Sequence, residues 1–427
     1  MKYKSGVSPA GEKYERLFSY LRAEGDAYYC GEGAYEISAE EATAEECESF
    51  LQGLRNEGFW ESAKSSIGDS DFYTYTDGNT AVYTALHKAV GACKAVVAPK
   101  GFLPEENETP DVDGDVTVTQ LDRLGYYQLN NGAPGICNIV KLADGRFAII
   151  DGGPDDRIVQ PMSRGEDGQW REDERITSHD KEDIYNFLLS ETGGKKPVIA
   201  LWIITHAHLD HIGLATKFIE EYRERIDLEV VGYNFPDFDT VDIDHENPKG
   251  IGVLVDRFKE AVSKTRAKTW IMRSGQRMKL AGCILEVLYT HEDTFPHYGN
   301  GRFPWCNHMS AAVRFIGKKR SFTALGDCES RLCRHMAERY GKAMKSDILQ
   351  VTHHGANGGY LPLYRLIDPD ICFWTCSDYA FYTNPQQLGI GEDYAFNAYL
   401  RDERVDITAG TRPRRHCCGG ETLGVVI

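Results

Sequence analysis

The stretch VIALWIITHAHLDHIG, residues 198–213, joins an apolar run to a cluster of polar side chains. Residues 198–204 are all apolar and rich in β-branched side chains, which predicts a buried strand. After the polar cluster, apolar side chains recur at helical spacing, at Ile212, Leu214, Ala215, Phe218, Ile219 and Tyr222. We therefore expect the polar cluster to lie on a turn between a strand and a helix.

The polar cluster holds side chains of the kinds that bind metal ions: His206, His208, Asp210 and His211. His206 and His208 are two residues apart, so on an extended backbone they point the same way and can hold one cation. Asp210 and His211 follow in the tightening turn and can face a second cation. Imidazole and carboxylate suit zinc, and also iron or manganese. Helix-capping residues with stray surface histidines are the simpler explanation, but the HxHxDH order favours metal binding.

This HxHxDH order resembles the signature of the metallo-β-lactamase fold superfamily, and the nearest resemblance is to the hydrolase domain of ComEC-type DNA-uptake proteins and their soluble relatives. The resemblance covers residues 115–427. It implies an α/β fold, namely an αββα sandwich in which two mixed sheets face each other with helices outside. It also implies a site at one edge, where loops from both sheets converge.

Three further motifs support the resemblance, and each leaves a choice open. Asp151 begins an Asp-Gly-Gly turn after a predicted hairpin of the Asp-Gly type, and it either supports a metal ligand or caps the turn. His308 stands where the superfamily places a third histidine for the first metal. Asn307 and Ser310 match the Asn-x-x-Ser frame of ComEC-type relatives, so Asn307 can replace His308. Because imidazole is the better zinc ligand, we favour His308.

The remaining motifs follow two more predicted strands. Gly326-Asp327 resembles the motif of the superfamily's bridging aspartate, since the glycine permits close approach. His353-His354-Gly355 resembles the final histidine motif of the ComEC-type group. We assign His354 to the second metal and give His353 a role as proton donor or phosphate contact, and the reverse assignment stays open.

The resemblance implies a metal-dependent hydrolase with two divalent ions, zinc first and manganese or iron as alternatives. One ion is expected on His206, His208 and His308. The other is expected on Asp210, His211 and His354, with Asp327 between the two ions. A metal-bridged hydroxide would attack an ester, and a phosphodiester is the favoured substrate. Asp210 and His353 are the residues expected to act in catalysis.

Two other functions remain open at this point. The first is a thioester, lactone or amide hydrolase on the same scaffold. The second is a non-enzymatic binding protein with a structural metal, whose coordination sphere would be closed by protein ligands. The seven candidate ligands exceed what one closed site needs, which favours catalysis.

Composition narrows the choice of partners and compartment. The net charge of −17 disfavours a dedicated nucleic-acid binder, which normally carries a basic stripe, so we expect a small-molecule or ester substrate. No apolar run approaches the roughly 20 residues that cross a bilayer, and no signal peptide is recognisable, so we expect no membrane contact. The 12 cysteines are scattered without a CxxC pair, which fits free thiols in the cytoplasm.

The chain is expected to divide into a small α+β unit at 1–103, an acidic, proline-bracketed linker at 104–114 and the hydrolase unit at 115–427. The small unit has no clustered ligands, and we assign it no chemistry. Its expected helices cover 12–22 and 43–57, and its expected strands cover 27–37, 72–76, 80–88 and 92–98. Residues 155–181 should form a charged loop near the site. Four further histidines and the basic cluster are expected to play structural or solvated roles: His87, His291, His297, His335, Arg412, Arg414 and Arg415.

Overall fold

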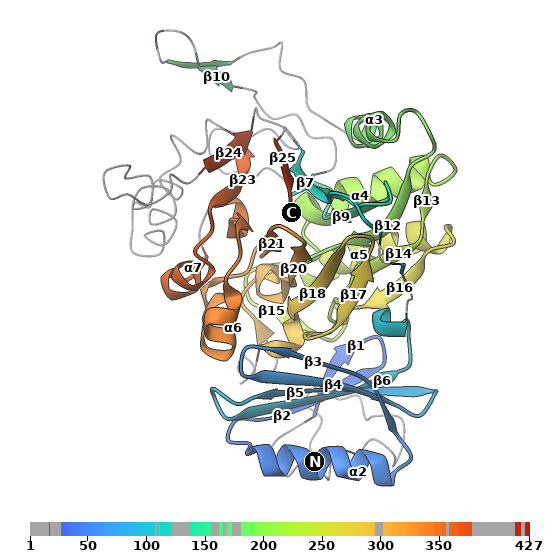
Figure 1. The fold of residues 1–427 in the computed structure, drawn as a ribbon, viewed down its shortest axis with the longest axis vertical. Helices are drawn as coiled ribbons and strands as arrows, with labels where there is room; N and C mark the ends of the chain where they lie inside the picture. The colour runs from blue at the N-terminus through green and yellow to red at the C-terminus, as the bar shows by residue number, and fades with distance from the viewer. Residues whose placement is uncertain are drawn as a thin grey trace.

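The computed structural model describes residues 17, 27–106, 109–110, 112–121, 136–154, 162–164, 167, 169–172, 181–294, 302–355, 358–377, 415–419 and 423–427. Within these residues the strands form three large sheets, two of which face each other (Figure 1). Several expectations concern segments outside the described residues, and they remain predictions. These are the helix at 12–22 apart from Leu17, most of the loop at 155–181, His297, Arg412 and Arg414.

The first sheet lies at the amino-terminal end of the molecule, with one helix across its outer face (Figure 1). Its order is β1-β2-β6-β5-β4-β3, and every pairing is antiparallel. The helix α2 begins after Thr43, which forms a capping box with Glu46, and packs Phe50 and Leu54 against the sheet. The bounds are β1 Tyr28–Gly31, β2 Ala34–Ala39, α2 Ala44–Asn56, β3 Trp60–Ile67, β4 Ser70–Thr76, β5 Thr80–His87 and β6 Ala92–Pro99.

Most of these elements match the sequence expectations, and two differ. The single strand expected at 27–37 was wrong, because the chain turns at Glu32 and Gly33, both of which have positive φ. Strand β3 was not anticipated, since seven of its eight residues are exposed or only partly buried and show no apolar alternation. His87 is a buried sheet residue, as expected, and its Nδ1 lies 2.9 Å from Ser70 Oγ.

The other two sheets face each other across an apolar core. One has the order β16-β14-β12-β9-β8-β7-β25, and the other has β17-β18-β20-β21-β22-β23-β24. Their facing side chains include Ile150, Ile203, Val287 and Phe322. Helices α3, α4 and α5 pack on the outer face of the sheet that contains β12. Helices α6 and α7 pack on the outer face of the sheet that contains β22 (Figure 1). This arrangement confirms the predicted αββα sandwich.

The strands of the two facing sheets and their flanking helices have the following bounds: β7 Thr117–Gln120, β8 Asn138–Lys141, β9 Phe147–Ile150, α3 Lys181–Glu191, β12 Val198–Ile203, α4 Leu209–Tyr222, β13 Asp227–Leu228, β14 Val230–Tyr233, α5 Pro248–Ser263, β16 Lys268–Ile271, β17 Arg277–Leu280, β18 Cys283–Tyr289, β20 Ala312–Gly317, β21 Ser321–Ala324, α6 Ser330–Tyr340, β22 Ile348–Gln350, α7 Leu361–Ile367, β23 Ile371–Ser377, β24 Arg415–Gly419 and β25 Leu423–Val426. Strands β10 Met162–Arg164 and β11 Trp170–Glu172 form a separate hairpin. Short 3-10 helices occur at η1 Pro104–Glu106, η2 His291–Asp293, η4 Cys306–Met309, η5 Gly341–Met344 and η6 Thr352–Gly355.

Parallel pairing brings the polar motifs to one edge of the sandwich. Strand β12 runs parallel to β9 and β14, and β21 runs parallel to β22. Parallel strands present their carboxyl ends at the same sheet edge. The metal-type residues follow the ends of β12, β21 and β22, and Asp151 follows β9. Strand β12 is apolar throughout because it is covered on both faces.

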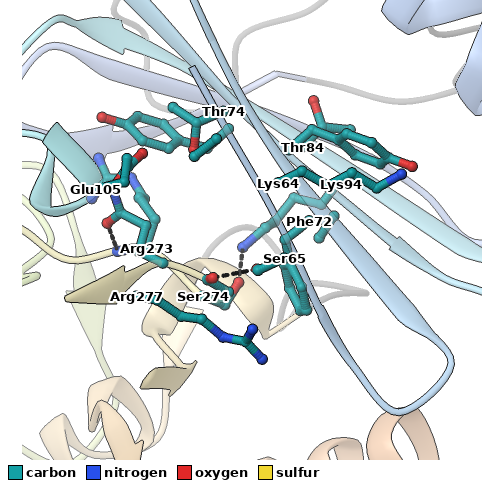
Figure 2. Close-up of a pocket in the computed structure, with 16 residues that line it drawn as sticks. Lys64, Ser65, Phe72, Thr74, Thr84, Lys94, Glu105, Arg273, Ser274 and Arg277 are labelled. Carbon is teal, nitrogen blue, oxygen red and sulfur yellow. Dashed lines mark hydrogen bonds between the residues drawn. The ribbon is translucent and has the colours of Figure 1, made fainter. Parts of the chain in front are cut away.

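The amino-terminal sheet meets the sandwich through buried charges. Lys94 Nζ on β6 lies 2.5 Å from Asp293 Oδ1. The same Nζ lies 3.3 Å from Ser274 Oγ (Figure 2). Arg273 Nε lies 3.1 Å from Glu292 Oε2, and both side chains are buried. A cavity at this junction is lined by side chains from both parts, among them Phe72, Tyr83, Lys94, Glu105 and Arg273 (Figure 2).

Two further histidines, His291 and His335, were expected to play structural or solvated roles. The expectation that His291 is solvated was wrong, because His291 lies buried in η2 with Nε2 3.1 Å from Asn234 Oδ1. His335 packs on α6 as expected, with Nδ1 2.9 Å from the Tyr289 hydroxyl. Among the helices that the structure describes, none has the length and apolar character needed to span a bilayer.

Candidate metal centre

The HxHxDH motif occupies the turn between β12 and α4, as its sequence predicts. His208 is the last residue before α4, and its extended backbone (φ −69°, ψ 150°) ends the strand-like path. Its carbonyl oxygen accepts hydrogen bonds from the backbone N–H groups of His211 and Ile212, both at 3.0 Å. The turn is therefore closed by the first turn of the helix, which leaves the His206 and His211 side chains buried.

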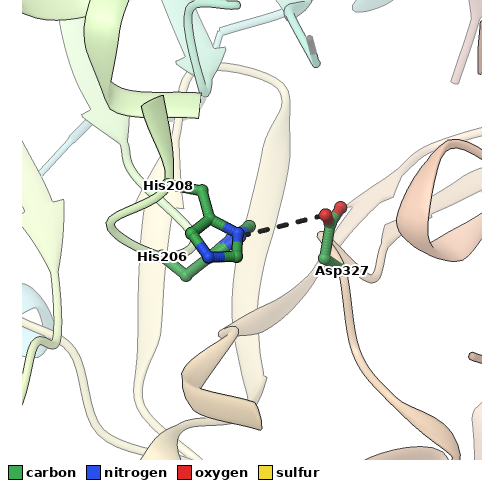
Figure 3. A group of neighbouring side chains, drawn as sticks. All are labelled: His206, His208 and Asp327. Atoms are coloured by element: carbon green, nitrogen blue, oxygen red, sulfur yellow. Dashed lines mark hydrogen bonds and ion pairs between the residues drawn. The ribbon is translucent and has the colours of Figure 1, made fainter. Parts of the chain in front are cut away.

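Two groups of ligand-type side chains assemble at this turn. His206, His208 and Asp327 form the first group, and Asp210, His211 and His354 form the second, with the ligand atoms of each group within 4.8 Å of one another. Figure 3 shows Asp327 facing His206 and His208 from a different segment of the chain. Each group combines imidazole with a carboxylate, which is a donor set for zinc, iron or manganese.

The carboxylate of Asp327 lies between the two groups. Its Oδ2 atom is 3.9 Å from His206 Nε2 in the first group. It is 3.3 Å from His211 Nε2 and 3.6 Å from His354 Nε2 in the second group. His353 Nε2 lies 3.7 Å from the same oxygen. One carboxylate oxygen is therefore within 4 Å of four imidazole nitrogens, the placement that a residue shared by two cations requires.

Two of the histidines are held from behind by carboxylates. His208 Nε2 lies 2.6 Å from Glu246 Oε1, and His211 Nδ1 lies 2.9 Å from Asp151 Oδ2. Asp151 also accepts hydrogen bonds from the N–H and hydroxyl of Thr205, at 2.7 and 2.8 Å. Such contacts fix the orientation of a ligating histidine and raise the basicity of its other nitrogen. Asp151 therefore orients His211, and Glu246 orients His208.

The other two histidines have neutral oxygen partners. His206 Nδ1 lies 3.2 Å from Thr205 Oγ1. His354 Nδ1 lies 3.1 Å from Thr375 Oγ1 and 3.3 Å from the Thr375 carbonyl oxygen. All four imidazoles of the two groups thus have an oxygen partner on the nitrogen that faces away from the group. This is the usual environment of metal-binding histidines.

The charges of the two groups favour cations. Burial raises the pKa of the Asp327 carboxyl, but the neighbouring His211, His354 and His353 outweigh burial and hold that pKa well below its usual range. Burial lowers the pKa of His354, yet Asp327 and Asp210 raise it to about 9. Without a cation, the carboxylates therefore stay ionised and hold protons on nearby imidazoles. A divalent ion would replace those protons.

The buried atoms of the two groups also test whether metal ions fit. His211 Nε2 and Asp327 Oδ1 are buried and make no hydrogen bond to any residue that the structure describes, although His211 Nε2 forms an ion pair with Asp327 Oδ2 at 3.3 Å. Buried polar atoms normally have a partner, and leaving one without it costs about 1–3 kcal/mol. Both atoms belong to the two groups, so coordination of divalent ions would satisfy them. The residues present fit the cofactors that the sequence predicts.

The segment 307–310 contacts the centre differently from the favoured expectation. His308 belongs to neither group, and burial is the main cause that lowers its pKa to about 4. Asn307 Nδ2 instead lies 3.2 Å from His353 Nε2, and Ser310 Oγ accepts a hydrogen bond from the Asp327 N–H at 3.3 Å. The first group therefore contains Asp327 and includes neither His308 nor Asn307.

His353 and His354 have a backbone conformation that the sequence did not reveal. Their φ angles are +50° and +56°, and Gly355 follows at +80°. A left-handed conformation is unfavourable for residues with a Cβ atom, and such strain concentrates at functional sites. Here it brings two successive imidazoles within 4 Å of Asp327 Oδ2.

Glu246 is a residue that sequence reasoning missed, because it lies outside every motif and contacts His208 only through the fold. We expect Glu246→Gln to weaken zinc affinity about 10- to 100-fold, since a neutral amide supports the imidazole less well. Zinc titration monitored with a competing chelator measures this. Glu229→Gln, which alters an exposed partner of Arg146, should leave zinc affinity unchanged. Equal affinities of the two variants would contradict the assigned role of Glu246.

Comparison with known proteins supports the fold. The family model described as the metallo-beta-lactamase superfamily matches residues 132–252, which include β12, the HxHxDH turn and α4. No curated protein matches the chain.

Three solved structures illustrate the likeness. YhfI from Bacillus subtilis, a metallo-beta-lactamase fold protein, is 11% identical over 73% of this chain and 100% of its own, with a TM-score of 0.37. CmlA from Streptomyces venezuelae, a diiron beta-hydroxylase, is 13% identical over 75% of this chain and 55% of its own, with a TM-score of 0.35. Human tRNase Z, short form, is 11% identical over 60% of this chain and 90% of its own, with a TM-score of 0.30. These values support no statement about activity. The chain is therefore similar to the metallo-β-lactamase superfamily over residues 132–252, and these residues lie within an αββα sandwich.

Proposed function

We propose that the protein is a metal-dependent hydrolase that holds two divalent ions. Members of the metallo-β-lactamase superfamily are generally metal-dependent hydrolases. The observation that carries the proposal is the position of Asp327 Oδ2, within 4 Å of imidazoles from both ligand groups. The proposed ligands are His206 and His208 for one ion, Asp210, His211 and His354 for the other, and Asp327 for both.

The proposed ester hydrolysis depends on both the bound ions and the residues around them. When bound, divalent ions in such a site lower the pKa of a water molecule and stabilise negative charge on an ester oxygen. The protein holds the imidazoles in place through Asp151 and Glu246. His353 is not one of the proposed ligands, and we assign it the contact with substrate because its side chain is 18% exposed and its Nε2 lies 3.7 Å from Asp327 Oδ2. Its Nδ1 lies 3.6 Å from Glu329 Oε1.

We favour a phosphodiester as the substrate. A phosphoryl group carries several negatively charged oxygens, and paired cations are suited to bind both the attacking and the leaving oxygen of its displacement. The net charge of −17 disfavours a long polyanion and favours a small diester. The His353-His354-Gly355 and Asn307-to-Ser310 motifs support a relationship to soluble ComEC-type hydrolases.

We also propose that residues 1–103 form a unit distinct from the hydrolase unit at 115–427, joined by 104–114. In support, the six-stranded sheet shares no strand with the two facing sheets among the described residues. The buried Lys94–Asp293 pair fastens the six-stranded sheet to the hydrolase unit.

The test combines metal analysis with a substrate panel. We expect purified protein to contain about two divalent ions per chain and to hydrolyse bis-p-nitrophenyl phosphate. Chelation should abolish hydrolysis, and zinc or manganese should restore it. Faster hydrolysis of lactone, thioester or amide substrates would favour the first alternative. A fully loaded protein that hydrolyses none of the panel would favour a metal-containing binding protein.

A further inference from the structure

Trp305 is a large aromatic side chain that the fold leaves in contact with solvent. Its exposed fraction is 43%, whereas Trp202, Trp270 and Trp374 are fully buried. Among the tryptophans whose side-chain exposure the structure describes, Trp60 is also exposed, at 54%. A single exposed aromatic side chain is common on protein surfaces, so the inference rests on the surroundings of Trp305.

Trp305 is held in place by a small two-stranded sheet. Strand β15 (Asp242–Ile243) pairs in parallel with β19 (Arg302–Phe303). The His245 N–H donates a hydrogen bond to the Pro304 carbonyl oxygen at 3.3 Å. The His245 and Trp305 rings lie with centroids 4.7 Å apart and planes inclined at 32°. The His245 ring therefore packs against the indole in a tilted stack, and we call this pair of rings the Trp305 platform.

The Trp305 platform is directly connected to the metal centre. His245 precedes Glu246, and Trp305 precedes Cys306. The Cys306 N–H donates a hydrogen bond to Glu246 Oε2 at 2.6 Å, while Glu246 Oε1 lies 2.6 Å from His208 Nε2. Both rings thus belong to residues adjacent to the contacts that orient His208. The His208 side chain is 21% exposed, so this side of the centre is open to solvent.

We propose that the Trp305 platform stacks against a planar, π-rich group of the substrate, an aryl or nucleobase substituent on the ester. The proposal rests on the function proposed above and adds the substrate class. An indole can stack on any aromatic face without a specific hydrogen-bond pattern. The metal centre would hold the ester, and the platform would hold its planar substituent beside His208. Trp305 lies outside the residues matched by the family model, so the family match does not assign this role.

The test compares two phosphonates that differ only in the planar group. Phenylphosphonate and methylphosphonate would be used as competitive inhibitors of bis-p-nitrophenyl phosphate hydrolysis. In the unmodified protein we expect phenylphosphonate to bind about tenfold more tightly, the size of effect that one stacking contact gives. Trp305→Ala should reduce this ratio to near one, and Trp305→Phe should keep most of it. Trp60→Ala, the matched control on edge strand β3, should keep the full ratio.

A second measurement separates this proposal from the proposed function. Phenylphosphonate should quench tryptophan fluorescence of the zinc-loaded protein, and Trp305→Phe should lose that quenching while Trp60→Phe keeps it. If no ester is hydrolysed but this quenching occurs, the proposed hydrolase function is wrong and the proposed stacking on the Trp305 platform is supported. If hydrolysis occurs and Trp305→Ala keeps the phenyl preference, the platform is overturned and the hydrolase function stands. A change of oligomeric mass in Trp305→Ala with an unchanged inhibitor ratio would identify a protein contact and would also overturn the proposal.

Discussion

Asp210→Ala is expected to abolish hydrolysis while leaving the fold intact. The Asp210 carboxylate lies 3.3 Å from His354 Nε2 and 3.9 Å from His211 Nε2, so its loss removes one ligand of the second group. Metal ions supply several kcal/mol of transition-state stabilisation, so we expect kcat/KM for bis-p-nitrophenyl phosphate to fall on the order of a thousandfold. Bound metal should fall from two ions per chain toward one, measured by elemental analysis of the same samples.

The fold should survive because of where Asp210 lies. It is in the first turn of α4, its side chain is 26% exposed, and alanine is a good helix former. Asp183→Ala, the same substitution in the first turn of α3, provides the matched control and should retain full activity. If folded Asp210→Ala protein hydrolysed the diester at the unmodified rate, the proposed mechanism would be wrong.

Lys94→Met is expected to have the largest effect on stability. Lys94 Nζ lies 2.5 Å from Asp293 Oδ1, and the two side chains are 3% and 0% exposed. Methionine keeps the apolar stem but leaves the Asp293 carboxylate buried without this cation. Breaking a buried pair in this way costs about 3–5 kcal/mol of unfolding free energy, measured by urea denaturation at pH 7. Lys319→Met, which removes an exposed pair with Asp115, should cost about 0–1 kcal/mol.

The pH dependence of this effect identifies its cause. Burial raises the pKa of Asp293, but Lys94 and Arg339 outweigh burial and lower it to about 2, below the ordinary value of 3.8. The stabilisation is therefore complete above about pH 4 and is lost as the pH falls through about 2. The stability difference between the unmodified protein and Lys94→Met should shrink over that range. A difference that stays constant with pH would indicate lost packing instead of a lost charge pair.

The sequence by itself determined the parts of the protein that depend on local periodicity. The apolar run at 198–204 predicted β12, and helical spacing after the histidines predicted α4. The Asp-Gly turn predicted the β8–β9 hairpin, and the apolar face of 43–57 predicted α2. In each case the signal lies within one segment, because the side-chain period follows from the backbone geometry of that segment.

Strands with one exposed face or with short length escaped this reasoning. Most residues of β3 are exposed or only partly buried, and β16 and β17 each have four residues. These strands form because they pair with neighbouring strands, and their own sequences contain no apolar pattern that predicts them. The turn at Glu32 and Gly33 likewise depends on positive φ angles that an aromatic, strand-like stretch does not indicate.

Only the tertiary structure decided how the candidate site is assembled. Motif spacing identified the histidines of the turn, but the contact of Asp327 with both ligand groups depends on two sheets meeting at one edge. The support of His208 by Glu246 joins residues 38 positions apart. The left-handed backbone of His353 and His354 is also invisible in their residue types. Residue types determine which ligands a chain can offer, whereas their distances and orientations are set by packing between segments that are remote in sequence.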